Sequence, residues 1–508
     1  MSDSRTSNSL KIIAVNIFNQ VLTIALSFIS RTVFLKVLSV DYLGISGLFG
    51  DILGMLTLAD LGFGTAMSYS MYKPLADRDY DKLAGLVNFY KNVYRVIALV
   101  ITIVGLAIVP FLKYLVNTES EIPNLTLYYI LYLANTVASY LVVYKTNVLH
   151  ADQKGYILGK YTAVFNVLRS ICMIGFLLLT HNFTAYLLVQ VVFTYITNFF
   201  NSHIAEKRYP YINKKVKLPK EETKGIFTNM GSVFLYKLAG ILINATDNTL
   251  ISVLVNTTAV GYYSNYTMIV NRLIGIVNTI FYSLTASIGN LIAKEGKERR
   301  FQIFETMQSV SSILSTFCIT CTFFLMEDFI SVWLGDTFVM ERIVLWALII
   351  NFYFSIILLP IWVFREATGL YRKTKFVMLI TATVNLAVSI MLGKTIGLAG
   401  VIFGTSIARL TTYFWYEPKL LFKEYFGVSC LVYFKEIIKG LCITALIFVI
   451  VYFCTDKIIV NNVTMLFVKA FIVGGISFFM VLIIYWRTEG VRILRMRFGS
   501  MLKGIAKK

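Results

Sequence analysis

Charged residues are scarce in this 508-residue sequence. They make up 15% of it, whereas soluble globular proteins carry about 25%. Acidic residues are the scarcest, with 27 Asp and Glu against 47 Lys and Arg. Hydrophobic residues reach 57%, and the mean hydropathy is +0.72. This composition excludes a soluble globular fold and predicts a polytopic membrane protein.

Residues that build metal centres and disulfide frameworks are also few. The six Cys and three His are dispersed along the chain. Cys318 and Cys321 form the one Cys-x-x-Cys, but it lies in an apolar run, where small packing residues are the better interpretation. The phosphate-binding pattern GxxxxGK[ST] of P-loop ATPases is absent. We therefore expect no metal site, no cofactor and no ATP hydrolysis.

Apolar segments of spanning length follow one another along the chain. A bilayer core needs about 20 helical residues, and continuous apolar runs do not fit alternating barrel strands, so each segment is predicted to be a helix. The first run lacks the cleavage pattern of a signal peptide and is expected to stay. Six predicted spans cover 12–37, 44–70, 88–112, 125–147, 157–180 and 183–204, and eight more cover 227–254, 259–290, 303–326, 341–364, 374–393, 396–416, 436–455 and 464–486.

Lys and Arg are concentrated in every second loop between the predicted spans. Even-numbered loops and both termini hold most of the basic residues, which predicts that these loops and termini are cytoplasmic. The net charge of +20 is thereby explained by membrane orientation, and a nucleic-acid partner is not expected. The longest polar run, 206–225, is predicted to be a basic cytoplasmic linker. Short outer loops leave no platform for an extracellular enzyme.

Two similar halves flank that linker. LGISGLF around Gly44 is echoed by VGYYSNY around Gly261, 217 residues later, and QKGYILGKY around Tyr156 is echoed more weakly around Tyr371. Duplicated halves joined by a cytoplasmic loop are typical of alternating-access transporters. We predict an N-lobe at 1–205, the linker at 206–225, a C-lobe at 226–417, and two further helices with a basic cytoplasmic tail at 418–508.

Polar residues recur at helical spacing inside several predicted spans. Asn16, Gln20 and Arg31 share one stripe of the first helix, and the seventh and eighth carry similar stripes. Such stripes line a cavity or serve as helix-packing seams. The candidate sugar contacts are Asn16, Gln20, Tyr236, Asn244, Tyr266, Asn271 and Tyr282, although packing or a place in the interfacial aromatic belt is the other interpretation of the tyrosines.

Cations outnumber acids within the predicted spans. A charge in mid-span costs about 2.5 kcal/mol or more and must face protein or water. The surplus indicates an anionic ligand, unless the cations pair locally or reach toward the interface. The cations are Arg31, Arg169, Lys237, Arg272 and Arg409, and the acids are Asp51, Asp60 and Asp247; Asp60, Lys237, Asp247 and Arg409 are candidates for cavity charge or ion coupling.

Extended patterns in both halves resemble the polysaccharide-transporter (Wzx-like) flippases of the MOP superfamily. The patterns are RTVF at 31–34, YLGISGLF at 42–49, LADLGFGTAMSYSMYKPLADRD at 58–79, YKNVYR at 90–95, TDNTLISVLV at 246–255 and VGYYSNYTMI at 260–269. The resemblance implies an all-α membrane protein of fourteen helices, two six-helix lobes plus two C-terminal helices, around an alternately open cavity. It also places Arg31 and Arg272 on cavity-lining helices.

Such proteins export undecaprenyl-pyrophosphate-linked oligosaccharide for capsule, O-antigen or exopolysaccharide. The expected function is therefore a flippase without covalent chemistry, in the bacterial cytoplasmic membrane, with polymerase and assembly proteins as its protein partners. Arg31, Arg169 and Arg272 would hold the pyrophosphate because guanidinium groups bind phosphate bidentately. Coupling to Na⁺ or H⁺ stays open. The alternatives are an ion-coupled extruder of cationic drugs, which would need an anionic cavity, and a membrane-embedded glycosyltransferase or polymerase.

Overall fold

The structure is a computed structural model. It describes residues 5–57, 63–118, 121–152, 154–219, 221, 223, 238–243, 245–486, 488 and 490–493. The chain forms two compact units, Met1–Gly261 and Tyr262–Lys508. The predicted lobe boundaries at 205 and 226 stay a prediction, and the boundary between the two compact units lies inside helix α12 (Thr257–Tyr282).

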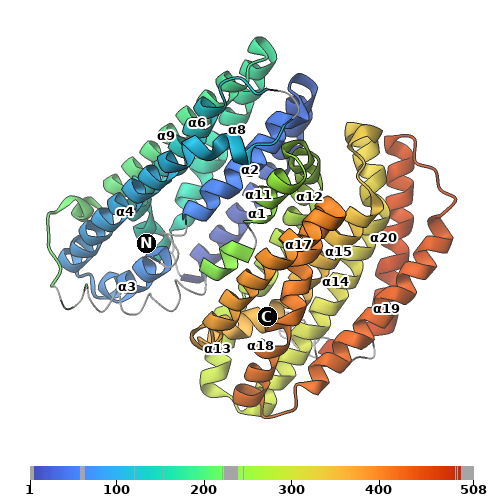
Figure 1. The fold of residues 1–508 in the computed structure, drawn as a ribbon. Coiled ribbons are helices and arrows are strands. Elements are labelled where there is room, and N and C mark those ends of the chain that lie inside the picture. The colour runs from blue at the N-terminus through green and yellow to red at the C-terminus, as the bar shows by residue number, and fades with distance from the viewer. Residues whose placement is uncertain are drawn as a thin grey trace. The chain divides into compact units, whose positions relative to one another are not determined.

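The regular secondary structure in the described part of the first unit is helical (Figure 1). They are α1 (Arg5–Val37), α2 (Val40–Leu56), α3 (Phe63–Asp77), α4 (Tyr80–Ile108), η2 (Val109–Phe111), α5 (Leu112–Leu115), α6 (Leu125–Tyr140), α7 (Val143–Ala151), α8 (Gly155–Thr180), α9 (Phe183–Arg208), η3 (Pro210–Asn213), α11 (Asp247–Leu254) and the start of α12 (Thr257–Tyr282). Helix α1 packs on α8, α8 on α9, and α9 on α6, which in turn contacts α4.

The second unit continues α12 and is likewise helical in its described part. Its further elements are α13 (Thr285–Lys294), α14 (Lys297–Leu334), η4 (Asp336–Phe338), α15 (Arg342–Ile357), α16 (Leu359–Thr368), α17 (Tyr371–Thr411), α18 (Tyr413–Leu421), η5 (Phe422–Phe426), α19 (Leu431–Thr455) and α20 (Val463–Tyr485). Helix α14 runs beside α15, α19 and α20, and α15 beside α17 (Figure 1).

Nine helices in the described part are long and apolar enough to cross a membrane, or up to eleven if each of two bent pairs forms one span. The region Lys373–Phe426 counts as one of them, but its 54 residues include non-helical backbone at Ile396 and Gly397, the first two residues of the predicted span 396–416. The all-α membrane fold is therefore confirmed. The fourteen-helix count is compatible with these elements and stays a prediction.

Several predicted spans are bent rather than straight. Helices α6 and α7 meet at 45°, and α15 and α16 at 41°. Pro360 stands in the first turn of α16, where its missing N–H ends the bonding of α15. At Gly397, φ is +60° and ψ is −138°, a conformation that a residue with a Cβ rarely adopts. Breaks of this kind allow one apolar stretch to change direction within the membrane.

Candidate functional site

Arg31 of α1 and Arg169 of α8, two of the predicted pyrophosphate ligands, lie in one cluster of the first unit. Both guanidinium groups are close enough to the hydroxyl of Tyr186, on α9, to interact with it electrostatically. Tyr132, on α6, is similarly close to Arg31 and Tyr186. The packing of α1 on α8, α8 on α9 and α6 on α9 brings these side chains together.

Aromatic packing fixes the position of the Tyr186 ring in this cluster. The ring of Tyr186 lies edge-on to Phe34, 5.3 Å away, and Phe34 also meets Phe183 edge-on at 5.8 Å. Arg31 and Arg169 are both only partly exposed. Two guanidinium groups beside phenolic hydroxyls can form charge-assisted bonds to an anion, and such bonds strengthen where water is scarce. The cluster is therefore suited to hold a phosphate-like group.

A polar cavity of about 520 Å³ lies in the same unit. Its polar lining comes from α1, α6, α7, α8 and α9, and consists of Asn19, Ser139, Thr146, His150, Thr162, Asn198 and Asn201. The amide nitrogen of Asn19 donates to the carbonyl of Gly159 at 3.1 Å, and that of Asn201 to the hydroxyl of Thr162 at 3.4 Å. Amides, hydroxyls and an imidazole are the groups that bind a neutral, hydroxyl-rich ligand.

Most of this lining was missed in the sequence. Gln20 was chosen for its place on the Arg31 stripe, but Asn19, its neighbour, lines the cavity. Asn198 and Asn201 also line it, three residues apart on α9. Their spacing was the available signal, since intramembrane asparagines one turn apart share a helix face. Thr162, on α8, also lines the cavity.

The second unit holds the other described candidates. Arg272, Asn271 and Tyr282 lie on α12, with Asn271 and Tyr282 exposed. The Tyr266 side chain is fully buried, and its hydroxyl accepts a bond from the backbone N–H of Met340 at 2.9 Å. The side chain of Arg409 is also buried.

Two of the predicted charge sites have defined partners. Arg409 donates to the carbonyl of Asn351 at 3.4 Å and to the hydroxyl of Ser355 at 3.2 Å. Asp51 accepts bonds from the backbone and side chain of Asn248. Asp247 is the first residue of α11. The predictions for Asp60, Tyr236, Lys237, Asn244 and the side chain of Asn16 lie outside the described residues.

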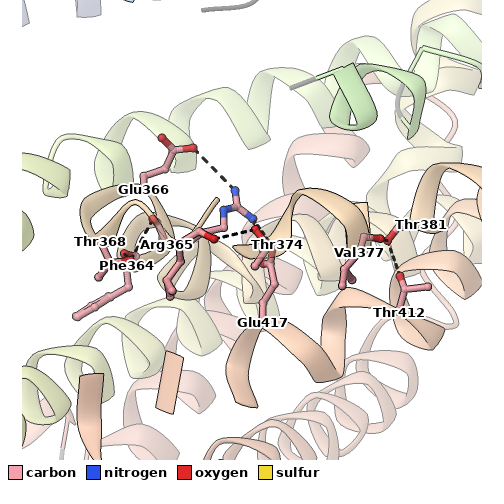
Figure 2. A network of polar contacts seen from close by, with 10 residues as sticks. Phe364, Arg365, Glu366, Thr368, Thr374, Val377, Thr381, Thr412 and Glu417 are labelled. Atoms are coloured by element: carbon pink, nitrogen blue, oxygen red, sulfur yellow. Dashed lines mark hydrogen bonds and ion pairs between the residues drawn. The ribbon is translucent and has the colours of Figure 1, made fainter. Parts of the chain in front are cut away.

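The structure adds a buried ion pair that was not predicted. One terminal nitrogen of Arg365, on α16, lies 3.0 Å from each carboxylate oxygen of Glu417, on α18. The side chains are only 6% and 2% exposed. Figure 2 shows the Arg365 guanidinium turned toward Glu417, with Glu366 on the other side at 3.9 Å. Both residues stand one position beyond the predicted spans 341–364 and 396–416, which is why the pair escaped attention.

The two echoed glycines, Gly44 and Gly261, meet each other in the first unit. A Cβ at Gly44 would lie 2.0 Å from the carbonyl oxygen of Thr257, and a Cβ at Gly261 would lie 2.4 Å from that of Val40. Between them, the hydroxyl of Thr258 donates to Asp41 at 2.5 Å, across 217 residues of sequence. Position 40 thus lies against 261, position 41 against 258, and position 44 against 257. Positions 257, 258 and 261 are also the ones that the offset of 217 relates to 40, 41 and 44.

Comparisons with known proteins identify the family. The model of the family described as polysaccharide biosynthesis protein matches residues 9–287. No curated protein sequence matches the chain.

Solved structures share the fold at low sequence identity. The lipid II flippase MurJ in an inward closed conformation matches with a TM-score of 0.68 and 14% identity, covering 94% of this chain and 98% of that one. An inward-facing multidrug resistance MATE family transporter of the MOP superfamily gives 0.59 and 14%, covering 78% and 93%. A MOP superfamily transporter from Pyrococcus furiosus, described by the reverse polarity of its binding pocket, gives 0.56 and 10%, covering 81% and 95%. The MOP transporter fold and a family match over more than half of the sequence lead to one conclusion: the chain belongs to the polysaccharide biosynthesis protein family, the Wzx-like flippases.

Proposed function

We propose that the protein is a flippase that carries undecaprenyl-pyrophosphate-linked oligosaccharide from the cytoplasmic to the outer leaflet, for capsule, O-antigen or exopolysaccharide. The observation that supports this most directly is the convergence of Arg31 and Arg169 on Tyr186. Two cations in one membrane-embedded cluster favour an anionic cargo, and a pyrophosphate diester carries two negative charges. The reaction involves no covalent step.

In this proposal the three parts of the substrate meet three kinds of surface. Arg31, Arg169 and Arg272 bind the pyrophosphate through bidentate, charge-assisted hydrogen bonds. Sugar hydroxyls bind amide and hydroxyl groups such as those of the polar cavity and the exposed Asn271 and Tyr282. The prenyl chain stays in the bilayer, where its burial requires no protein contact.

Transport proceeds by alternating access between the two halves in the bacterial cytoplasmic membrane, with both termini in the cytoplasm. Energy comes from Na⁺ or H⁺ coupling or from downhill movement of the substrate. Asp60, Lys237, Asp247 and Arg409 are the charges that we assign to coupling or to cavity electrostatics. Polymerase and assembly proteins take over the product at the outer face.

An extruder of organic cations is the runner-up. It requires a free carboxylate in the cavity, since a cationic drug must exchange with Na⁺ or H⁺ there. Asp51 already accepts bonds from Asn248, and the described cluster around Tyr186 carries the opposite charge. Binding of drug cations to the purified protein would favour the extruder.

Reconstituted protein tests the proposed function directly. Vesicles receive a fluorescent undecaprenyl-pyrophosphate oligosaccharide in both leaflets, and a membrane-impermeant quencher reports the outer fraction over time. We expect protein-dependent movement without ATP, and none for the same fluorophore on phosphatidylcholine. If the oligosaccharide lipid stays in its leaflet in the presence and absence of ion gradients, the proposed function is wrong.

A further inference from the structure

The first part of the basic linker is held against the cytoplasmic end of α4. The amide nitrogen of Asn88 donates to the backbone carbonyls of Lys214, at 2.5 Å, and Val216, at 3.3 Å. Gly85, one turn earlier, leaves room for Leu218, whose nearest carbon would lie 3.0 Å from a Cβ at that position. Residues 214–218 therefore follow the surface of α4 rather than extending into solvent.

Tyrosines anchor the segment that enters this docked stretch. The ring of Tyr211 lies 4.9 Å from that of Tyr80, the first residue of α4. The hydroxyl of Tyr209 donates to Asp152 at 2.5 Å. Burial, this hydrogen bond and the carboxylate charge raise the pKa of Tyr209, so the hydroxyl keeps its proton and remains a donor at neutral pH. The path of the linker from 209 to 218 is thus fixed at several points.

This docking gathers four cations, Lys91, Arg95, Lys145 and Lys215, which we call the basic cluster. Lys91 interacts electrostatically with the other three cations, and the one carboxylate that it meets among the described residues is Glu206. Four cations and one carboxylate leave a surplus of three positive charges. Lys145 pairs with Glu206 at 2.5 Å, so this carboxylate is already engaged.

Helix geometry places the α4 members of the cluster beside the linker. Asn88, Lys91 and Arg95 are three and four residues apart, which puts them on one face of α4. Because Asn88 holds the carbonyls on both sides of Lys215, that lysine is presented on the same face. Like charges brought together in this way repel one another, and a bound anion would offset this repulsion.

An apolar surface continues directly from Arg95 along α4. Val96, Leu99 and Ile103 are 60%, 58% and 58% exposed, and their spacing follows the helix toward the membrane core. We call these three residues the α4 stripe. A basic cluster at the cytoplasmic end and an exposed apolar stripe above it match a lipid with an anionic head group.

We propose that the basic cluster binds the diphosphate of a polyprenyl lipid at the cytoplasmic surface, while the prenyl chain lies along the α4 stripe. A diphosphate diester brings two negative charges to the surplus of three, whereas a glycerophospholipid such as phosphatidylglycerol brings one. The choice of a polyprenyl diphosphate as the ligand rests on the proposed function. It would collect the substrate before the substrate reaches Arg31 and Arg169.

Photocrosslinking tests the site by its location. Full-length protein in phosphatidylcholine vesicles is irradiated with a glycosyl polyprenyl diphosphate, a diester, that carries a diazirine in its first isoprene units, and the labelled peptides are mapped. We expect label within 96–103. In the double variant Lys91→Gln/Arg95→Gln, labelling within 96–103 should fall about tenfold, because charge-assisted bonds to the diphosphate are lost. Both changes relieve repulsion between like charges, so folding should be unaffected, as size-exclusion chromatography would show.

Two further variants separate specific binding from general charge. Asn88→Ala keeps every cation but frees the linker, so label at 96–103 should fall about threefold through the loss of Lys215 alone. Lys435→Gln removes an exposed cation of the second unit and should leave labelling unchanged.

A tenfold excess of phosphatidylglycerol should compete little with the probe. Unchanged label in the double variant, or full displacement by phosphatidylglycerol, would overturn the site. Because the readout is label at 96–103, a failure of transport by the wild type would refute the proposed function without touching this result.

Discussion

Arg365 and Glu417 form a buried ion pair in the second unit, so the stability of this unit depends on both side chains. Removing one partner of a buried pair leaves the other charge uncompensated, which costs about 3 to 5 kcal/mol. We expect Glu417→Ala to lower the free energy of unfolding by that amount. The double variant Arg365→Met/Glu417→Met should recover most of the loss. Chemical denaturation of the detergent-solubilised protein measures both.

The exposed pair Lys439 and Glu436 is the matched control. Their side chains are 51% and 52% exposed, at 3.4 Å, and exposed pairs contribute about 0 to 1 kcal/mol. Glu436→Ala should therefore change stability little. A similarly small effect of Glu417→Ala would show that water or a relaxed backbone compensates Arg365.

Arg31 and Arg169 should affect transport rather than abundance. A charged hydrogen bond contributes about 1.5 to 3 kcal/mol, so Arg31→Gln or Arg169→Gln should slow oligosaccharide movement about tenfold or more. Arg→Lys variants keep the charge but lose the bidentate geometry and should retain partial activity. Vesicle assays at matched protein amounts give the rates. Normal rates for both Gln variants would remove these arginines from the site.

Residue spacing predicted one part of the site and hid another. The sequence singles out Arg31 and Arg169 because a charge within an apolar span must face protein or water, and the structure places both close to Tyr186. Arg365 and Glu417 could not be singled out from the sequence. Each lies just past the end of a predicted span, where a charged residue is ordinary and needs no partner. The cavity lining escaped because Asn19 is one residue away from the Arg31 stripe, and a sequence does not show which face of α1 meets α8 and α9.

At the scale of elements, the crossing of α2 with the start of α12 depends on the absence of side chains at Gly44 and Gly261. Gly44→Leu would drive atoms into the Thr257 carbonyl, which lies 2.0 Å from a Cβ at that position. We expect the pair Asp41→Cys/Thr258→Cys to form a disulfide with a mild oxidant, and Gly44→Leu to suppress it. Gel shifts after cleavage between residues 41 and 258 report the bond.

Gly50 supplies the control on the same helix. A Cβ there meets no atom within 4 Å, so Gly50→Leu should leave crosslinking intact. Efficient crosslinking in the Gly44→Leu background would mean that α2 and α12 can approach along another path.

Apolar length predicted where the helices lie but not how they bend. Spans 125–147 and 341–364 were expected as single helices, yet each is a pair bent by more than 40°. Pro360 signalled one of these breaks. The other, near Val142, has no proline or glycine at the turn, so packing rather than local propensity sets it. Gly397, with its positive φ, lies at the break between the two helical stretches of α17.

At the scale of the whole molecule, the distribution of Lys and Arg predicts the membrane topology. Cysteines at Lys214 and Lys297 should react with an impermeant maleimide from the cytoplasmic side alone, and a cysteine at Asn117 from the outer side alone. Inside-out and right-side-out vesicles give the two readings. Labelling of position 297 from the outer side would mean that the number of spans before it is odd.

The register of 217 residues at the α2 and α12 crossing bears on why the halves are joined in one chain. In a homodimer of identical halves, a residue on the two-fold axis faces its own copy. If such an axis passed between positions 41 and 258, Asp41 would meet a second aspartate, and two ionised carboxylates would offer each other no donor. A continuous chain is free of that constraint: position 258 is threonine, and its hydroxyl donates to Asp41. The threonine at position 258 thereby supplies a hydrogen-bond donor that a second aspartate would supply only when protonated, while Gly44 and Gly261 keep the close approach of α2 and α12.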